Sequence, residues 1–259
     1  MRNIKLTIEY DGSEFKGWQI QTGKGRTVQG EITQALRKIL KEDVKIIGSG
    51  RTDTGVHALA QVAHFKTQTK KSTDLLLKAI NANLPQDISI QKVEEMDLNF
   101  HAQHSVVSKV YRYAILNQAI RSPLRRKVCC FFPFPLNINL MKKESQSLIG
   151  RYDFKSFQAS DPAKLKKGKL STTVRTIHNI TFSTTDNIIY ITIEGDGFLY
   201  KMVRNIVGTL IEIGHKNLPK GTLQNILLKK NRKYAAKTAP ACGLTMLQVN
   251  YERPLNKDI

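Results

Sequence analysis

The sequence has few cysteines, few acidic residues and no long hydrophobic run. Two of its three cysteines, Cys129 and Cys130, are adjacent and the third, Cys242, is distant, so neither a disulfide framework nor a Cys-x-x-Cys metal site is predicted. The most apolar stretch, residues 128–136, is too short to span a membrane and contains two prolines. The chain opens on an alternating strand pattern and not on an apolar signal segment. We therefore expect a soluble, cytoplasmic protein without a structural metal.

The shortage of acidic residues leaves the chain strongly basic. Its 259 residues carry 41 Lys+Arg against 21 Asp+Glu, which gives a net charge of +20. Such an excess predicts a polyanionic partner, because neutralised phosphates release their counterions. Three basic segments, at residues 121–127, 164–169 and 229–233, would spread the positive charge over a larger surface for such a partner. Each segment by itself is also typical of a solubilising surface.

Hydrophobic periodicity predicts two half-chains with the same order of elements, β-α-β-β-α-β. In the first half the expected strands cover residues 4–10, 44–47, 56–65 and 88–93, and the expected helices cover 27–39 and 74–84. Thr27 is the expected cap of the first helix. In the second half the expected strands cover 111–116, 176–183, 188–194 and 244–251, with a hairpin turn at Asp186–Asn187. The expected helices cover 138–148, 200–213 and 222–228, which adds one helix to the order. We predict an α+β fold of two ferredoxin-like lobes, residues 1–100 and 101–259, with a linker near 97–108. The lobes are expected to share an extended antiparallel sheet with a central cleft.

One segment, residues 48–58 (GSGRTDTGVHA), places a single carboxylate in a turn between glycines. An aspartate in a turn is usually a capping residue. Glycines on both sides allow close approach of a bulky group to Asp53, and Arg51 offers a planar cation for a phosphate or a base. Because the chain is basic, the expected bulky group is a nucleic acid.

Two further residues stand out in the second half. Arg204 lies in an apolar helix, where an unpaired charge is costly. Its expected partner is a nearby carboxylate (Glu194, Asp196 or Glu212) or Asp53 across the cleft. Tyr111 shares one face of a strand with Tyr113, and it serves either as a packed aromatic or as a stacking platform for a base.

Other motifs are weaker. Residues 48–50 are not followed by the Gly-Lys-Ser/Thr of a phosphate-binding loop, and no Gly-x-Ser-x-Gly elbow is present. His101 and His104 have no cysteine partners, and His57 and His64 lie seven residues apart on a strand, so structural or exposed histidines are predicted.

Several blocks taken together resemble the TruA-type tRNA pseudouridine synthases. They are residues 11–19 (DGSEFKGWQ), 27–30 (TVQG), 50–58 (GRTDTGVHA), 111–113 (YRY), 198–208 (FLYKMVRNIVG) and 238–240 (TAP). They occur in family order over nearly the whole chain. The chain departs from the family pattern at Gln103 and His104, at Gly197 and at Thr245–Met246. The change at Gln103 puts one RNA or structural contact in doubt.

The resemblance implies conversion of uridine to pseudouridine at positions 38–40 of the tRNA anticodon stem-loop, by a homodimer without cofactor or metal. It implies that Asp53 is the catalytic nucleophile and that Arg204 pairs with it. Tyr111 would stack on the extruded uracil and assist loss of the C5 proton. Arg51 would fill the space that the base leaves or hold the adjacent phosphate, and Leu244 would close the apolar side of the pocket.

Two alternatives from other classes remain. One is a non-catalytic RNA-binding protein with tandem ferredoxin-like lobes, although no Lys/Arg-Gly-Phe-x-Phe run is present. The other is a metal-dependent nuclease that uses Asp53 with Asp153 or Asp196.

Overall fold

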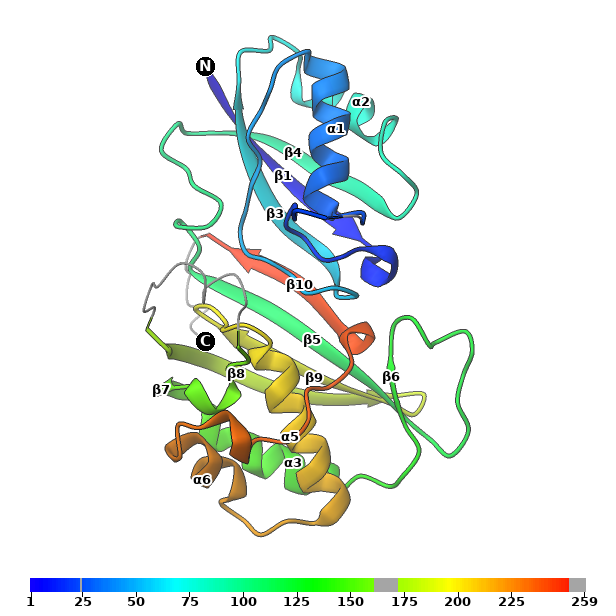
Figure 1. Ribbon diagram of the computed structural model, residues 1–259, viewed down its shortest axis with the longest axis vertical. Helices are drawn as coiled ribbons and strands as arrows, with labels where there is room; N and C mark the ends of the chain where they lie inside the picture. The colour runs from blue at the N-terminus through cyan, green and yellow to red at the C-terminus, as the bar shows by residue number, and fades with distance from the viewer. Residues whose placement is uncertain (24, 161–171, 252–259) are drawn as a thin grey trace, which may run out of the picture. The chain divides into compact units, whose positions relative to one another are not determined.

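The computed structural model describes residues 1–23, 25–160 and 172–251 (Figure 1). Its contacts divide the chain into two units, the first comprising Met1–Lys109 and the strand from Thr245, the second Val110–Leu244. The last strand thus belongs to the first unit, whereas the sequence analysis placed everything after residue 100 in the second lobe. The expected basic segment 164–169 lies outside the described residues.

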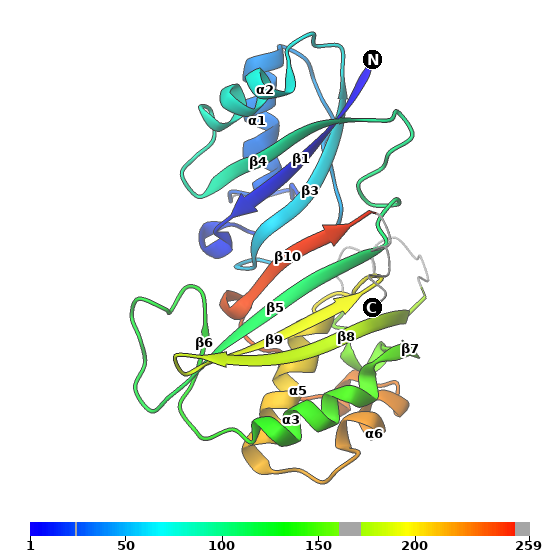
Figure 2. The ribbon, with the colours of Figure 1, turned by 180° about the vertical axis from the view of Figure 1, so that it is seen from behind.

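The first unit is a mostly antiparallel sheet with two helices on one face (Figures 1 and 2). Its elements are β1 (Arg2–Tyr10), α1 (Val28–Leu40), β2 (Ile47–Gly48), β3 (His57–Thr67), α2 (Thr73–Asn81), β4 (Ile88–Met96) and β10 (Leu244–Asn250). The strand order is β4-β1-β3-β10, and β2 also pairs with β3. All of these pairs are antiparallel except β3 with β10.

Alternation along β1 produces the core of the first unit. Ile4, Leu6 and Ile8 are fully buried, as are Ile32 and Leu36 on α1. The expected cap of α1 is confirmed, because the Thr27 hydroxyl accepts a hydrogen bond from the Gly30 amide. An amphipathic helix over an alternating strand thereby buries both apolar faces.

The strand expected at residues 44–47 is wrong in its bounds, since β2 comprises only Ile47–Gly48. Val44 and Ile46 are buried, as their apolar character predicts. The carbonyl of Ile46, however, accepts a hydrogen bond from the buried Gln29 side chain at 2.9 Å. A side chain on α1 therefore takes the acceptor that a strand ladder would need.

The second unit also pairs a sheet with helices on one face (Figures 1 and 2). Its elements are β5 (Ser108–Asn117), β6 (Cys130–Phe132), α3 (Ile138–Ser145), β7 (Gly150–Asp153), β8 (Val174–Thr185), β9 (Ile188–Gly195), α5 (Met202–Lys216) and α6 (Thr222–Leu228). The strand order is β5-β9-β8-β7, with β6 parallel to β5. The expected hairpin turn is confirmed, since Asp186 and Asn187 both have positive φ, 48° and 62°.

The segment expected to be a linker, residues 97–108, packs as part of the first unit. Phe100 and Ala102 are buried, and the side-chain amide of Asn3 donates from Nδ2 to the carbonyls of Asp97 and Phe100. The mixed α+β class with mainly antiparallel sheets is confirmed. The joining of both lobes through one sheet with a cleft stays a prediction. Among the described residues, no helix is long and apolar enough to cross a membrane.

Candidate active site

Asp53 lies in the turn that connects β2 to β3. Its carbonyl accepts a hydrogen bond from the Val56 amide at 3.2 Å, which closes the turn. Gly55 has a φ of +78°, a conformation that residues with a side chain rarely adopt. The Asp53 side chain is half-buried and Arg51 is exposed. The sequence therefore places a partly accessible carboxylate on a turn whose shape depends on Gly55.

The segment before α1 packs directly against this turn. A Cβ at Gly12 would overlap the carbonyl oxygen of Val56. The Gly12 amide donates to Nδ1 of buried His57 at 3.1 Å, and the Trp18 amide donates to the Thr52 carbonyl at 3.1 Å. The block at residues 11–19 is therefore a support for the Asp53 turn, a role that the sequence analysis did not assign.

Thr52, beside the carboxylate, is held from β1. Its hydroxyl shares a hydrogen bond of 2.8 Å with the Tyr10 phenol, and both side chains are buried. Burial raises the pKa of Tyr10 to about 12, so the phenol stays protonated at neutral pH and keeps this bond.

Two side chains hold the residues that precede Arg51. Lys109 donates from Nζ to the Ser49 carbonyl at 2.7 Å, and buried Gln61 donates to the Gly50 carbonyl at 3.1 Å. The Ser49 hydroxyl in turn donates to Oε1 of Gln61 at 2.6 Å. Neither side chain was predicted from the sequence as part of the site. A glutamine inside an apolar strand pattern was the available signal for Gln61.

The remaining candidate residues belong to the second unit. Tyr111 on β5 is 8% exposed, and its ring meets Phe198 edge to face, with centroids 5.2 Å apart. Tyr113 is fully buried, and its hydroxyl donates to the Pro240 carbonyl at 2.7 Å. Phe198 thus orients one tyrosine ring, whereas a hydrogen bond to the 238–240 block holds the other.

Arg204 is bound to that same block. Its Nε donates to the Ala239 carbonyl at 2.8 Å, and its own carbonyl accepts from the Ala239 amide at 3.1 Å. A Cβ at Gly208, one turn later on α5, would overlap the carbonyl oxygen of Lys237. Segment 237–239 therefore lies tightly along α5 and orients the Arg204 side chain.

Asn205 connects this arrangement to the rest of the unit. It is fully buried, and its Nδ2 donates to the Phe157 carbonyl at 2.7 Å. Its Oδ1 accepts from the Thr238 hydroxyl at 2.6 Å and from Arg232 at 3.1 Å. In the sequence Asn205 stands out only as part of a motif, and the structure gives it a central packing role.

Two of the carboxylates considered near Arg204, Asp196 and Glu212, have local partners. Asp196 accepts from the Thr176 amide at 3.0 Å, and Glu212 forms an ion pair with Lys216 one turn later. Leu244, at the start of β10, is 6% exposed. Asp53 and Arg51 lie in the first unit and Tyr111, Arg204 and Leu244 in the second. The pairing of Asp53 with Arg204, and the pocket role of Leu244, stay predictions.

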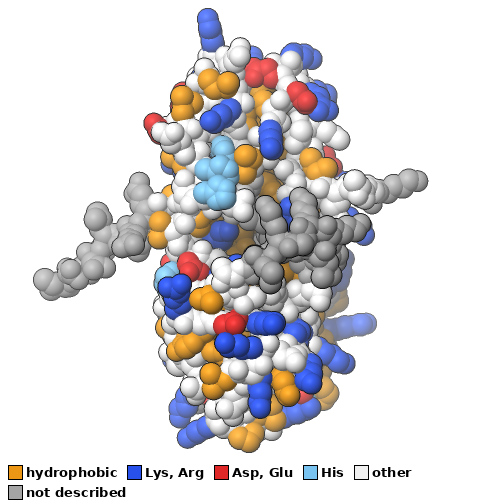
Figure 3. Space-filling model, turned by 60° about the vertical axis from the view of Figure 1, so that its left-hand side comes forward, with side chains coloured by type: hydrophobic (Ala, Val, Ile, Leu, Met, Phe, Trp, Pro, Cys, Tyr) orange, Lys and Arg blue, Asp and Glu red, His pale blue; other side chains and the backbone are white. Residues whose placement is uncertain are grey.

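Three histidines of the first unit, His64, His101 and His104, lie ring beside ring. Figure 3 shows pale blue histidine side chains on the face that it draws. The centroids of His64 and His101 are 4.9 Å apart, and those of His101 and His104 are 4.2 Å apart. Nδ1 of His64 accepts from the Ala102 amide, and Nδ1 of His101 accepts from the amides of Gln103 and His104. These histidines hold loop 101–105 only while their Nδ1 atoms are unprotonated. In the part of the chain that the structure describes, no group of three or more His, Cys, Asp or Glu could hold a metal.

This dependence predicts acid destabilisation. Burial, together with the charge of His101 and Lys66, lowers the pKa of His64 to about 4, below its ordinary value of 6.5. A group whose pKa is lower in the folded state stabilises the fold above its unfolded pKa, and that stability is lost as pH falls toward the folded pKa. We expect up to about 3 kcal/mol of unfolding free energy to disappear between pH 6.5 and 4.

Urea unfolding across this pH range measures the loss. His64→Asn keeps an acceptor for the Ala102 amide and removes the titration. The difference in unfolding free energy between the wild type and this variant should then change with pH in that window. Parallel curves for the two proteins would contradict the assignment.

Comparisons with known proteins agree with the resemblance. A family model described as tRNA pseudouridine synthase matches residues 6–105 and 145–252. Two proteins named tRNA pseudouridine synthase A align with 97% of this chain and with 100% of their own length. The one from Thermoanaerobacter sp. (strain X514) is 42% identical and the one from Ruminiclostridium cellulolyticum is 44% identical. A solved structure of a Cbf5–Nop10–Gar1 complex is similar to 93% of this chain and 57% of its own chain, at 10% identity and a TM-score of 0.32. By the matched family model and by these relatives, the chain belongs to the tRNA pseudouridine synthase family.

Proposed function

We propose that this protein is an isomerase that converts uridine to pseudouridine in tRNA, at positions 38–40 of the anticodon stem-loop. The observation that carries the proposal is the half-buried Asp53 carboxylate, which lies on a turn held by hydrogen bonds and within the residues that the family model matches. The net charge of +20 suits a polyanionic substrate. The relatives' name supplies the reaction and tRNA as its substrate.

The reaction breaks the N1–C1′ bond of uridine, turns the uracil and joins C5 to C1′. C5 loses a proton and N1 gains one, so no atom is gained or lost overall. A carboxylate suits this chemistry because it can attack C1′, as in retaining glycosidases. Attack on the uracil ring and removal of a sugar proton are the other routes open to Asp53.

The roles of the other candidate residues are those that the resemblance implies, and the surroundings of two of them suit these roles. Arg51 is exposed, so its guanidinium can occupy the place of the extruded base or hold a phosphate. Lys109 and Gln61 fix the backbone just before it, because they bind the carbonyls of the two preceding residues. Tyr111 presents a ring that Phe198 orients, which suits stacking on uracil. Arg204 pairing with Asp53 and Leu244 closing the pocket are carried over from the resemblance.

The ferredoxin-like interpretation of the lobes is also part of the proposal. In its support, the first unit pairs its strands in the order β4-β1-β3-β2, all antiparallel, with α1 and α2 between them in the chain. A homodimer is expected from the resemblance and a cytoplasmic location from the sequence composition, and both stay predictions.

Incubation of the purified protein with an unmodified tRNA transcript tests the function. Pseudouridine at positions 38–40, formed in the presence of a chelator, is the expected product. Binding without modification would favour a non-catalytic RNA-binding protein, and chelator-sensitive cleavage would favour the nuclease. Asp153 is one of the two carboxylates that the nuclease alternative would combine with Asp53. It accepts hydrogen bonds from the Thr173 hydroxyl and the Lys155 amide, which gives it a local structural role.

Lys109 should act as a positioning residue. Lys109→Met removes a charge-assisted hydrogen bond to the Ser49 carbonyl, so kcat should fall at least about tenfold while KM changes little. Lys109→Arg should restore most of the rate. Lys45→Met, an exposed lysine before β2, serves as the control. A raised KM with unchanged kcat would instead make Lys109 an RNA contact.

A further inference from the structure

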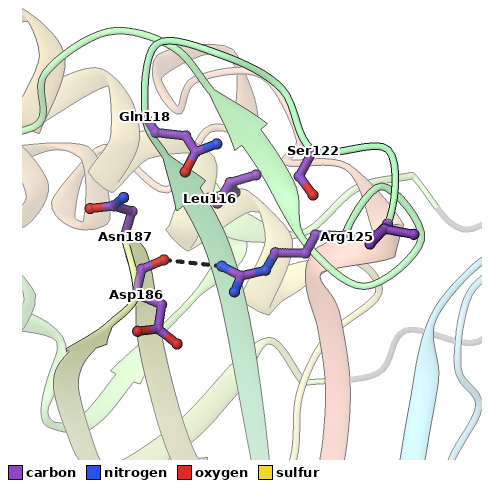
Figure 4. Close-up of a pocket in the computed structure, with 7 residues that line it drawn as sticks. Leu116, Gln118, Ser122, Arg125, Asp186 and Asn187 are labelled. Atoms are coloured by element: carbon purple, nitrogen blue, oxygen red, sulfur yellow. Dashed lines mark hydrogen bonds between the residues drawn. The ribbon is translucent and has the colours of Figure 1, made fainter.

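A cavity of about 520 Å³ opens in the second unit, and none of the candidate site residues lines it. It lies where β5 ends, between the loop that leads to β6 and the turn between β8 and β9 (Figure 4). Its lining residues are Leu116, Gln118, Ser122, Leu124, Arg125, Asp186 and Asn187. The size is typical of a small-molecule site.

Hydrogen bonds hold the walls of this cavity in place. Arg125 donates from its guanidinium to the Asp186 carbonyl at 3.0 Å, as Figure 4 shows. The Arg125 carbonyl accepts from the amides of Val128 and Cys129 at 3.1 and 3.0 Å. Across the cavity, the Asn117 amide donates to the Asn187 carbonyl at 2.8 Å. The loop is therefore ordered before any ligand arrives, which lowers the entropic cost of binding.

The lining combines the groups that a nucleotide requires. Leu116 forms a buried apolar wall, whereas Leu124 is 92% exposed at the edge. The Gln118 and Asn187 amides and the Ser122 hydroxyl supply donors and acceptors of the kind that bind base edges. The half-buried Arg125 supplies a planar cation for a phosphate.

Charge continues outside the cavity along the same loop. Arg121, Arg126 and Lys127 are exposed, and Arg126 is folded back onto the Pro123 carbonyl at 2.7 Å. The nearby acid in the lining is Asp186. Several cations on the loop beside a cavity of this size fit a polynucleotide better than a free mononucleotide, because a backbone carries a phosphate at each step.

We propose that this cavity binds one unpaired nucleotide of the RNA substrate, with its base between Leu116 and Leu124 and its phosphate at Arg125. The proposal rests on the proposed function, because it takes tRNA as the partner. It adds a second point of contact, separate from the reacting uridine, and predicts an effect on binding and not on chemistry.

Two variants test the cavity, and a third serves as control. Arg125→Gln should weaken binding of an unmodified tRNA transcript about tenfold, and it should reduce the slope of log K against log salt by about 0.7 to 0.9. Leu124→Ser, at an exposed position, should weaken binding severalfold without changing that slope. The double variant Lys142→Gln/Lys143→Gln, on exposed residues of α3, should change binding less than twofold. Thermal unfolding of each variant shows whether it is folded.

Further measurements separate the outcomes. Single-turnover pseudouridine formation at saturating enzyme should match the wild type in both cavity variants. Unchanged tRNA affinity in both would overturn the proposal. So would micromolar binding of UMP, CMP, AMP or GMP that both variants abolish without any effect on tRNA, because a free nucleotide would then be the ligand. If the wild type forms no pseudouridine, the proposed function fails, and the affinities and salt slopes still decide whether the cavity binds RNA.

Discussion

Asp53→Asn should abolish pseudouridine formation, lowering the single-turnover rate by roughly 10⁴-fold or more, while the affinity for tRNA stays within about threefold of the wild type. Asparagine has nearly the shape of aspartate but cannot act as a carboxylate nucleophile or base. The turn itself should survive, since its closing hydrogen bond joins the backbone of residue 53 to Val56. Single-turnover assays and equilibrium binding with the same transcript measure both quantities.

Asp43→Asn is the matched control for this substitution. Asp43 precedes β2, its side chain is 84% exposed, and it pairs with Arg37. An exposed ion pair contributes little to stability, so this variant should behave like the wild type. Normal turnover by Asp53→Asn would show that Asp53 takes no part in the chemical step.

Tyr111→Phe should lower the rate about 10²-fold or more without weakening tRNA binding. The phenylalanine ring keeps the edge-to-face contact with Phe198 and the surface on which a base stacks. Only the hydroxyl is lost, and a positioned acid or base typically contributes 10²–10⁴-fold. Parallel measurements of rate and affinity separate the loss of the hydroxyl from a loss of stacking.

Tyr113→Phe, two residues away on the same strand, should lower stability and leave most of the activity. Its hydroxyl donates to the Pro240 carbonyl from a fully buried position. Removing it should cost about 1–2 kcal/mol of unfolding free energy and leave most of the activity. If Tyr111→Phe turned over like the wild type, the Tyr111 hydroxyl would have no chemical role.

Local patterns in the sequence were sufficient for many elements. Alternation predicted β1, and spacing of apolar residues predicted α1 and α6. The Thr27 cap and the Asp186–Asn187 turn were predicted because each depends on neighbours within a few residues. The bounds of β2 were not, because a glutamine 17 residues away takes the carbonyl of Ile46.

For the candidate site, the sequence alone indicated which residues to propose for the chemistry. Asp53, Arg51 and Gly55 belong to one short segment, and the shape of their turn depends on the freedom of Gly55 to adopt positive φ. Resemblance of separate blocks then indicated the reaction. Both inferences need only the chemical nature of residues and their order in the chain.

Only the tertiary structure decided what holds those residues in place. Lys109 and Gln61 bind the two carbonyls before Arg51, and Asn205 joins α5 to segments far away in the chain. It also decided that the strand from Thr245 belongs with the first unit. Such contacts join residues that are distant in sequence, and buried polar groups choose partners by where the folded backbone places them, which no local pattern records.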